Sequence, residues 1–268
     1  MKRFILFFAC SLALIGCKSE SEKNLELAKE LEEESFQDPG IDEDESSEEI
    51  NIEPISHATL AINWGETTIY VDPTGGSEAF EGMNEADLVL LTDIHGDHMD
   101  PKTLSALNLG NTPIIAPQAV NEQLPDSLTQ SLTVMNNGET INEQDFSIEA
   151  IPMYNLREEA LQYHEKGRGN GYVLEKDGKR LYIAGDTEDI PEMRNLENID
   201  IAFVPMNLPY TMPVDAAADA VLDFAPKKVY PYHFRGQDGK ADVEKFRQLV
   251  NESNEDIEVV LAEWYPNE

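Results

Sequence analysis

The sequence has 268 residues, of which 41% are hydrophobic, so it is long enough for one large domain with its own core. It carries 53 acidic residues against 19 basic ones, a formal net charge of -34. This balance argues against a nucleic-acid partner, because nucleic-acid binding depends on basic side chains at the phosphates. It does not exclude a small anionic substrate that a metal ion draws in.

The N-terminus has the pattern of an export signal. Lys2 and Arg3 precede an apolar stretch, residues 4–15, that is too short to span a bilayer as a stable helix. The stretch ends at Leu14-Ile15-Gly16-Cys17, which resembles the lipobox of bacterial lipoproteins, where the peptide is cut before the cysteine and the cysteine is acylated. An ordinary signal peptide or a buried apolar start is the alternative.

These features predict a lipoprotein signal peptide over residues 1–16 and an acylated Cys17 that anchors the exported chain to the cell envelope. The next residue, Lys18, is not the aspartate that retains enteric lipoproteins at the inner membrane, which by resemblance favours the outer membrane. The second cysteine, Cys10, lies within the signal. The mature domain therefore has no thiol for a disulfide, a nucleophile or a metal ligand.

An acidic segment follows the lipobox. Residues 18–53 hold 15 acidic and 3 basic residues and few large apolar ones, so they cannot bury enough surface to fold alone. We expect residues 17–53 to form a flexible acidic tether and residues 54–268 to form the folded domain.

The folded part predicts many short strands and a few helices. Predicted strands cover residues 56–62, 67–71, 86–91, 146–153, 171–175, 180–184, 199–204, 228–232 and 257–262, and predicted helices cover 101–107, 214–224 and 243–251. This pattern favours two sheets packed together with helices outside. Several strands run directly into polar residues, so chemistry is expected at their C-terminal ends.

The densest polar segment follows the strand at 86–91. It reads Asp93-Ile94-His95-Gly96-Asp97-His98, four potential metal ligands within six residues. A loop at a strand end can turn such side chains in two directions at once, which suits two adjacent metal ions.

Here the chain resembles the metallo-β-lactamase superfamily, whose motif is His-x-His-x-Asp-His after a strand. The resemblance covers nearly all of residues 55–265, and its order and spacing are most similar to the branch of sugar-phosphate lactonases and N-acyl-phosphatidylethanolamine phospholipase D-like proteins. Further segments that carry it are Ser56–Thr59, Tyr70–Pro73, His164 to Tyr172, Ala184–Thr187 and Tyr232-His233. The resemblance implies an α+β fold, a four-layer αββα sandwich.

The resemblance also implies a set of ligands. It assigns Asp93, His95 and His164 to one metal, Asp97, His98 and His233 to the second, and Asp186 between them. Asp93 stands where the family usually has histidine. It could ligate, in which case an oxygen-rich site shifts the preference from zinc toward manganese or iron, or it could support a ligand without touching the metal.

Other residues are assigned supporting roles. His57 and Asp72 are expected to support the ligands, because metal-bound imidazoles usually donate their second N–H to a carboxylate or carbonyl; for His57 a core position in a strand is the alternative. Loop residues that could contact the substrate, or serve only surface and turn roles, are Tyr154, Asn155, Arg157, Arg168, Asn170, Tyr210 and Arg235.

The predicted function is metal-dependent hydrolysis of a small ester, lactone or phosphodiester. Two divalent ions, zinc or else manganese or iron, would activate water, with Asp97 as the catalytic residue that orients the nucleophile or manages its proton. A phospholipase-like hydrolase acting on membrane lipid and a non-catalytic metal- or ligand-binding lipoprotein are the alternatives. The sequence indicates no oligomeric state.

Overall fold

Two β-sheets form the centre of residues 49–266, the part of the chain that the computed structural model describes. The predicted signal peptide, Cys17 and the tether up to residue 48 lie outside the described residues. The first sheet runs, in spatial order, β1 (Ile50–Ser56), β2 (Thr59–Trp64), β3 (Thr67–Val71), β4 (Leu88–Leu90), β5 (Ile114–Ala116) and β6 (Leu132–Val134). The second sheet runs β15 (Glu258–Val259), β12 (Lys228–Tyr232), β11 (Ile201–Pro205), β10 (Lys179–Ile183), β9 (Gly169–Lys176), β8 (Phe146–Met153) and β7 (Thr140–Glu143).

The two sheets have the same mixed topology. In the first sheet β1, β2 and β3 pair antiparallel, whereas β3, β4, β5 and β6 pair parallel. In the second sheet β7 to β10 pair antiparallel, whereas β10, β11, β12 and β15 pair parallel. Parallel strands end at the same edge of a sheet, so the segments that follow them meet there.

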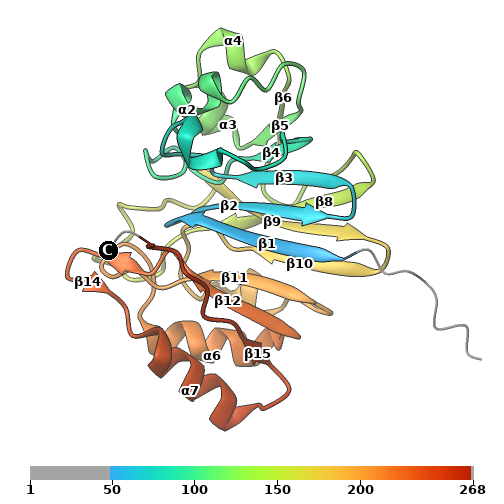
Figure 1. The fold of residues 1–268 in the computed structure, drawn as a ribbon. Helices are drawn as coiled ribbons and strands as arrows, with labels where there is room; N and C mark the ends of the chain where they lie inside the picture. Colours follow the sequence, from blue (N-terminus) through green and yellow to red (C-terminus); the bar gives the residue numbers. More distant parts are fainter. Residues whose placement is uncertain (1–48, 267–268) are drawn as a thin grey trace, which may run out of the picture. The chain divides into compact units, whose positions relative to one another are not determined.

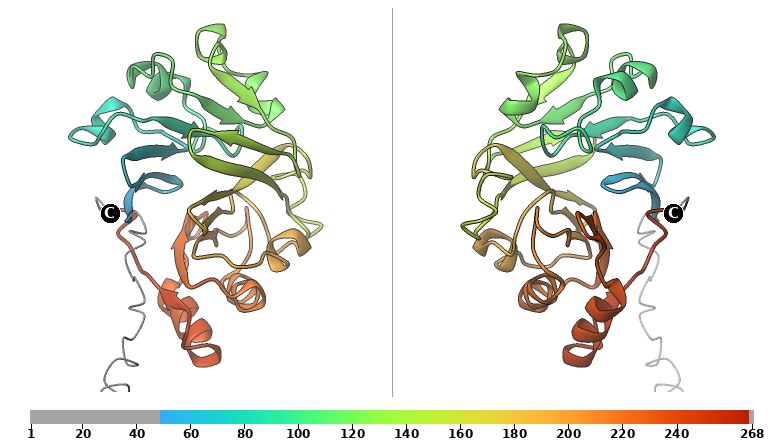
Figure 2. Two further views of the ribbon diagram at one scale, coloured as in Figure 1. Left: turned by 90° about the vertical axis from the view of Figure 1, so that its right-hand side faces the viewer. Right: turned by 90° about the vertical axis from the view of Figure 1, so that its left-hand side faces the viewer.

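Helices cover the outer faces of both sheets. Figure 1 shows α2, α3 and α4 beside the first sheet and α6 and α7 beside the second, and the two side views in Figure 2 show the sheets between them. The helices and short elements are η1 (Ser77–Phe80), α2 (Pro101–Ala106), α3 (Gln118–Asn121), α4 (Asp126–Thr129), α5 (Pro191–Arg194), α6 (Val214–Phe224), α7 (Val243–Ser253) and the strand pair β13 (Arg235–Gly236) and β14 (Gly239–Lys240). No helix among these described residues is long and apolar enough to cross a membrane.

Alternation along the strands explains the layers. Leu60 and Ile62 of β2 belong to a buried cluster that also contains residues of the second sheet, whereas Ala61 between them belongs to a separate cluster. That second cluster contains Leu104 of α2 and Val120 of α3. Successive side chains of a strand point to opposite faces, so the first sheet has helices on one face and the second sheet on the other. This confirms the predicted α+β sandwich with helices outside.

The observed elements agree with the sequence prediction over most of the second sheet. Strands β8 and β12 and helix α6 have the predicted bounds, and a turn at Asp177-Gly178 joins β9 to β10 as an antiparallel hairpin. The prediction missed β5, β6 and β7 and the short helices α3, α4 and α5. These elements are three or four residues long, too short to show a periodic pattern.

Several predicted boundaries were wrong, and three of them change the description of the fold. The tether was predicted to reach residue 53, but β1 begins at Ile50 and pairs with β2 from that residue onward. The strand predicted over residues 56–62 is interrupted at His57, whose φ of 57° is left-handed and incompatible with a strand. The final strand predicted over 257–262 is confined to Glu258–Val259.

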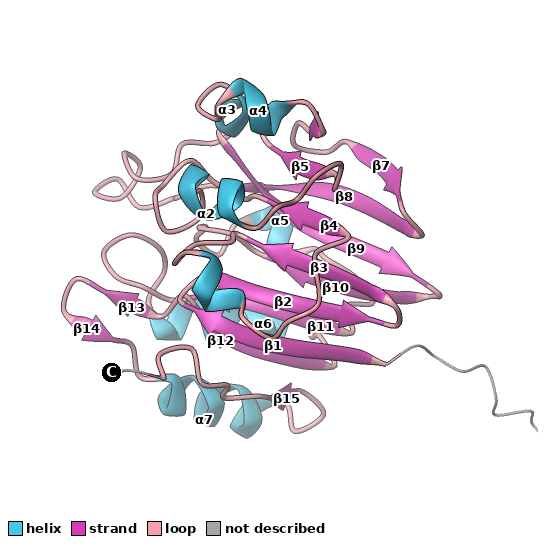
Figure 3. Cartoon of the chain, turned by 45° about the horizontal axis from the view of Figure 1, so that its top comes forward, coloured by secondary structure: helices cyan, strands magenta, loops and turns pink. Residues whose placement is uncertain are grey.

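The long loops gather at one end of the strands, as Figure 3 shows in pink. The strands β3, β4, β10, β11 and β12 all lead into this group of loops. The segments that follow these strands contain all of the predicted metal ligands except His164, which lies in the loop after β8. The sandwich therefore serves to bring residues from distant parts of the sequence to one edge.

The core between the sheets predicts one sensitive position. Phe203 of β11 is fully buried, with its ring 5.1 Å from that of Tyr230 and 5.9 Å from that of Tyr232. We expect Phe203→Ala to lower the free energy of unfolding by about 3–5 kcal/mol, because the cavity cannot collapse between packed aromatic rings. Denaturant unfolding measures the change. The control Leu156→Ala, at a side chain 46% exposed, should change it by less than about 0.5 kcal/mol; equal losses would contradict the proposed core.

Candidate metal centre

Three buried side chains from different loops form the tightest cluster at this edge. His98 follows β4, Asp186 follows β10 and His233 follows β12. His98 Nε2 lies 3.1 Å from His233 Nε2 and 3.3 Å from Asp186 Oδ2, and His233 Nε2 lies 3.3 Å from Asp186 Oδ1. The ligand atoms of a tetrahedral zinc site, with bonds of about 2.0–2.1 Å, lie roughly 3.3 Å apart. The spacing therefore fits one metal ion held by these three residues.

The carboxylate of Asp186 shows the need for a cation most directly. The residue is only 3% exposed, and its Oδ1 has no hydrogen-bond partner among the described residues. Burial works to raise the pKa of Asp186, but the positive charges of His233, His98 and His164 outweigh it and hold that pKa well below its usual range. A buried, ionised oxygen without a hydrogen bond is costly unless a cation neutralises it, so the donor set fits a divalent metal.

A second carboxylate orients His98. Asp72 is fully buried, and its Oδ2 lies 2.7 Å from His98 Nδ1 and 2.6 Å from Thr92 Oγ1, while its Oδ1 accepts a hydrogen bond from the Thr92 amide at 2.7 Å. Burial raises the pKa of Asp72, although the charge of His98 and these hydrogen bonds oppose the change. With Nδ1 bound to a carboxylate, His98 presents Nε2 to the cluster. Metal-binding histidines are commonly held in this way.

His233 and His57 are held together beside Asp97. The two imidazole rings have their centroids 3.8 Å apart. Asp97 Oδ2 lies 3.3 Å from His57 Nε2 and 3.4 Å from His233 Nε2, and His57 Nδ1 lies 2.7 Å from the hydroxyl of Tyr265. Burial lowers the pKa of His57, against the raising influence of Asp97. His57 is thus a fixed partner of Asp97. Because His57 lies in the turn between β1 and β2, the alternative of a core histidine within a strand does not apply.

The side chain of Asn207 fixes the outer side of His233. Its amide group lies 2.8 Å from His233 Nδ1, and its backbone amide donates to Thr211 Oγ1 at 3.0 Å. Asn207 follows β11, and its place after a buried strand was the one signal in the sequence that could have identified it. The sequence prediction assigned it no role.

Backbone strain accompanies this arrangement. His57, Asp72 and His233 have φ values of 57°, 45° and 46°, all in the left-handed region. Residues other than glycine adopt this conformation at a cost, although Asp and His tolerate it better than most. Such strained residues concentrate at functional sites, where the surrounding structure holds them in place. Three of them at one cluster support its functional role.

A second group of potential ligands lies next to the first. Asp93 Oδ2 is 2.8 Å from His95 Nδ1, and His164 Nε2 is 3.0 Å from Asp186 Oδ2. Ligand atoms of Asp93, His95 and His164 all lie within 4.8 Å of one another. Asp186 therefore borders both groups, in the place the resemblance assigns to a residue between two metals.

Asp93 differs from the other carboxylates in its partners. Arg168 Nε donates to its Oδ1 at 3.0 Å, and Arg168 Nη2 donates to its Oδ2 at 2.8 Å. Burial works to raise the pKa of Asp93, but the hydrogen bond from His95 and the charges of His98, His95 and Arg168 outweigh it and lower that pKa. The sequence prediction placed Arg168 among residues that could contact substrate and did not anticipate this pairing.

The loop that carries His164 folds back onto the site. The backbone amide of Asn155 donates to the backbone carbonyl of His164 at 3.0 Å, and Arg157 Nε donates to Glu188 Oε1 at 2.7 Å. His164 Nδ1 lies 3.1 Å from the carbonyl of Tyr210. When Nδ1–H donates to that carbonyl, the lone pair of Nε2 faces the Asp186 carboxylate, and a cation between them removes the repulsion.

A pocket of about 280 Å³ opens onto these groups. It is lined by His95, Asp97, Tyr163, His164, Asp186, Asn207 and Tyr210. The rings of Tyr163 and Tyr210 meet edge to face, with centroids 5.1 Å apart. Tyr163 was missed by the sequence prediction, and its position next to His164 was the only available signal.

Among the residues predicted to contact substrate, Tyr210 lines the pocket. Two others use their amide groups within the protein. Asn155 Nδ2 donates to the carbonyls of Ala160 at 2.9 Å and Tyr210 at 2.6 Å, and buried Asn170 donates to the carbonyl of Met135 at 2.9 Å. These contacts fix the loops around the pocket.

The remaining two predicted residues pair with other side chains. The hydroxyl of Tyr154 donates to Glu192 Oε2 at 2.9 Å. The guanidinium of Arg235 lies 5.1 Å from the centre of the Tyr265 ring, and its backbone amide donates to the Tyr265 hydroxyl at 3.1 Å. Arg235 is thus attached to the residue that holds His57.

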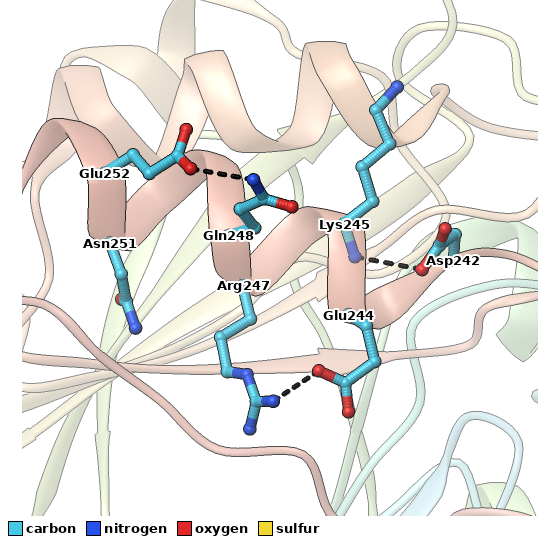
Figure 4. A pocket seen from close by; sticks show the side chains of 7 residues that line it. All are labelled: Asp242, Glu244, Lys245, Arg247, Gln248, Asn251 and Glu252. Carbon is cyan, nitrogen blue, oxygen red and sulfur yellow. Dashed lines mark hydrogen bonds and ion pairs between the residues drawn. The ribbon is translucent and has the colours of Figure 1, made fainter.

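A larger surface hollow, of about 620 Å³, lies elsewhere, along α7. Figure 4 shows that charged and amide side chains line it and that several of them pair with one another. Gln248 donates to Glu252 at 2.7 Å, and Arg247 pairs with Glu244. It contains no histidine and no buried carboxylate, so it is not a competing site.

A two-sheet sandwich with histidines and carboxylates in the loops at one edge defines a class of metal-dependent hydrolases. Comparison with known families agrees. The model described as "Beta-lactamase superfamily domain" matches residues 51–233, and the chain belongs to this superfamily and, within it, to the UPF0173 metal-dependent hydrolases. The prediction of a metallo-hydrolase of this superfamily is thereby confirmed.

Individual relatives support this assignment. A UPF0173 metal-dependent hydrolase of Thermococcus onnurineus is 32% identical over 218 residues, which cover 78% of this chain and 95% of the relative. A crystal structure described as a metal-dependent hydrolase, from Parabacteroides distasonis, is 39% identical with a TM-score of 0.72, covering 81% of this chain and 94% of that chain. The metallo hydrolase Igni18 of Ignicoccus hospitalis, 23% identical over 80% of this chain and 94% of its own, shares the fold with a TM-score of 0.66.

The contact between Asp72 and His98 generates a prediction. We expect Asp72→Asn to weaken metal binding by about 10–100-fold, because the imidazole loses the charged acceptor that orients it. Competition with a chromogenic chelator measures the affinity. Asp87→Asn is a matched control, since Asp87 also accepts a backbone hydrogen bond, at 2.9 Å from the Thr68 amide, but does so on the exposed surface. An unchanged affinity in Asp72→Asn would show that this carboxylate does not support a ligand.

Proposed function

We propose that the protein hydrolyses a small ester, lactone or phosphodiester with a metal centre built on His98, Asp186 and His233. The observation that carries this proposal is the buried carboxylate of Asp186: its Oδ1 has no hydrogen-bond partner among the described residues, and its two oxygens together have three imidazole nitrogens at 3.0–3.3 Å. His98, Asp186 and His233 would hold a divalent cation, which would lower the pKa of water and polarise the carbonyl or phosphoryl oxygen of the substrate.

Asp97 is the residue best placed to manage a proton. Its side chain is 45% exposed and lines the pocket, whereas its Oδ2 is held by His57 and His233. Burial works to raise the pKa of Asp97, but the hydrogen bonds from His233 and His57 and the charge of His98 outweigh it and lower that pKa. Asp97 is therefore ionised near neutral pH and can accept a hydrogen bond from an attacking water, while His57 and Tyr265 keep its carboxylate in position.

The pocket favours a small substrate. Its volume of about 280 Å³ is at the lower end of what small-molecule sites occupy. The edges of Tyr163 and Tyr210 offer an apolar wall beside the carboxylates. These features support a lactone, a simple ester or a small phosphodiester, as in the branch of sugar-phosphate lactonases, over a phospholipid bound in full.

The fully loaded centre would hold two divalent ions. His98, Asp186 and His233, with Asp97 beside them, would bind one, and Asp93, His95 and His164 would border the other. The histidines suit zinc, whereas the carboxylates shift the preference toward manganese or iron.

We expect loss of the central carboxylate to abolish this activity. Asp186→Ala should lose both bound metal and hydrolysis across a panel of lactones, aryl esters, phosphodiesters and phospholipids, because it removes the charge that all three imidazoles face. The control Asp219→Ala, at a side chain 72% exposed on α6, should keep both. Hydrolysis that continues at the same rate in metal-free Asp186→Ala protein would overturn the proposed function.

We propose further that the domain works at the cell envelope, held through acylated Cys17 by the acidic tether. The lipobox-like sequence Leu14 to Cys17 supports this location, and it lies outside the described residues. Two or more acyl chains make an anchor durable, because each buried methylene contributes about 0.8 kcal/mol.

The anchor has its own test. Cys17→Ser should release the exported protein from the membrane fraction into the soluble fraction, because acylation requires the thiol. Fractionation of cells grown with a labelled fatty acid measures both location and lipid attachment. Cys10→Ser, within the apolar stretch, is the matched control and should keep the label. Equal labelling of all three proteins would contradict acylation at Cys17.

A further inference from the structure

The two groups of ligands differ in the charge that surrounds their carboxylates. Asp186 and Asp97 face imidazole nitrogens, at 3.0–3.4 Å. Asp93 faces a guanidinium as well as an imidazole. An imidazole can release its proton and give a lone pair to a metal ion, whereas a guanidinium stays charged at any pH a protein tolerates.

The guanidinium of Arg168 is held firmly against Asp93. Both carboxylate oxygens accept from it, at 3.0 and 2.8 Å, and Nη2 also donates to the carbonyl of Tyr163 at 2.6 Å. Asp93 is fully buried, and the Arg168 side chain is only 17% exposed. A two-pronged ion pair of this geometry is among the stronger interactions of a carboxylate, and water screens it little here.

This pair weakens the Asp93 position as a metal site in two ways. The lone pairs of the carboxylate already accept N–H donors, so a metal must share or displace them. The positive charge of Arg168 also repels a dication that approaches Asp93, His95 and His164. The histidine partners of Asp186 have neither effect once they are neutral. Their nitrogens then need not donate to the carboxylate, and they carry no charge that repels a dication.

We propose that the two positions bind metal unequally and in order. The position of His98, Asp186 and His233 fills first and holds its ion tightly, whereas Arg168 keeps the position of Asp93, His95 and His164 weak. At limiting metal the chain carries one ion, and the fixed guanidinium supplies one unit of positive charge where a second ion would supply two. This proposal rests on the metal centre of the proposed function and concerns its occupancy.

Metal stoichiometry and affinity test the proposal without any substrate. The full chain is stripped with a chelator and titrated with Zn²⁺ and, separately, with Mn²⁺ by calorimetry, and metal retained after gel filtration in metal-free buffer is counted by mass spectrometry. The wild type should retain one ion, with the second constant weaker by on the order of a hundredfold. Arg168→Gln should tighten that weaker constant by on the order of tenfold or more and approach two retained ions, because Asp93 then carries an uncompensated buried charge.

Two control variants separate charge from shape and from general effects. Arg168→Lys keeps the positive charge but loses the fork, and it should preserve most of the gap between the two constants. Arg247→Gln, on the exposed side of α7 (Figure 4), removes an arginine that pairs with Glu244 and should change nothing. If Arg168→Gln and Arg247→Gln give the same two constants as the wild type, the proposal is wrong.

A further variant covers the case in which Arg168→Gln does not fold, which circular dichroism would reveal. Asp93→Asn, with Arg168 in place, should still retain one ion with the wild-type tight constant, since the tight position does not use Asp93. Loss of that ion, or two tightly held ions in the wild type, would overturn the unequal occupancy. These titrations measure metal occupancy and not hydrolysis. A result that overturns the unequal occupancy therefore does not by itself overturn the proposed hydrolase activity.

Discussion

A carboxylate buried among three imidazoles is the constraint on which the site depends. Asp186 is 3% exposed and has nitrogens of three histidines 3.0–3.3 Å away. Removing such a charge from water costs several kcal/mol unless opposite charge and hydrogen bonds replace the lost hydration. The surrounding groups are arranged accordingly: Asp72 holds His98, Asn207 holds His233, and the Tyr210 carbonyl holds His164. Each second contact leaves one imidazole nitrogen directed at the same point.

The sandwich makes this convergence possible. Strands β3 and β4 pair parallel in one sheet, and β10, β11 and β12 pair parallel in the other, so the residues after them emerge at one edge. His98 and His233 are 135 residues apart in sequence and 3.1 Å apart in space for this reason. The core between the sheets is apolar and closely packed, whereas the edge carries the left-handed turns at His57, Asp72 and His233. The rigid layers therefore sustain the strained loops that place the ligands.

The sequence predicts those features that depend on local pattern. Strand β8 alternates apolar and polar residues, strand β11 is a continuous buried run, and the site residues read as polar side chains that follow such strands. The pairing of Arg168 with Asp93 could not be predicted, because it joins residues 75 positions apart and depends on how the loop before β9 folds back. Strand β1 was hidden within an acidic run, where only half-buried Ile50 and Ile52 mark its inward face. The turn at His57 depends on a backbone conformation that composition does not reveal.

Because the protein is so acidic, the position of Arg168 beside Asp93 is the feature that distinguishes the two candidate metal positions. With 53 acidic and 19 basic residues, the chain attracts cations over its whole surface. That general attraction is screened beyond about 8–10 Å at ordinary ionic strength, so it cannot decide between two positions that share Asp186. Only charges within a few ångströms can do so, and there Asp93 has a guanidinium whereas Asp186 has imidazoles that can lose their protons. In the proposed order of metal binding, one half-buried arginine thus decides between the neighbouring positions, whatever the net charge of the protein.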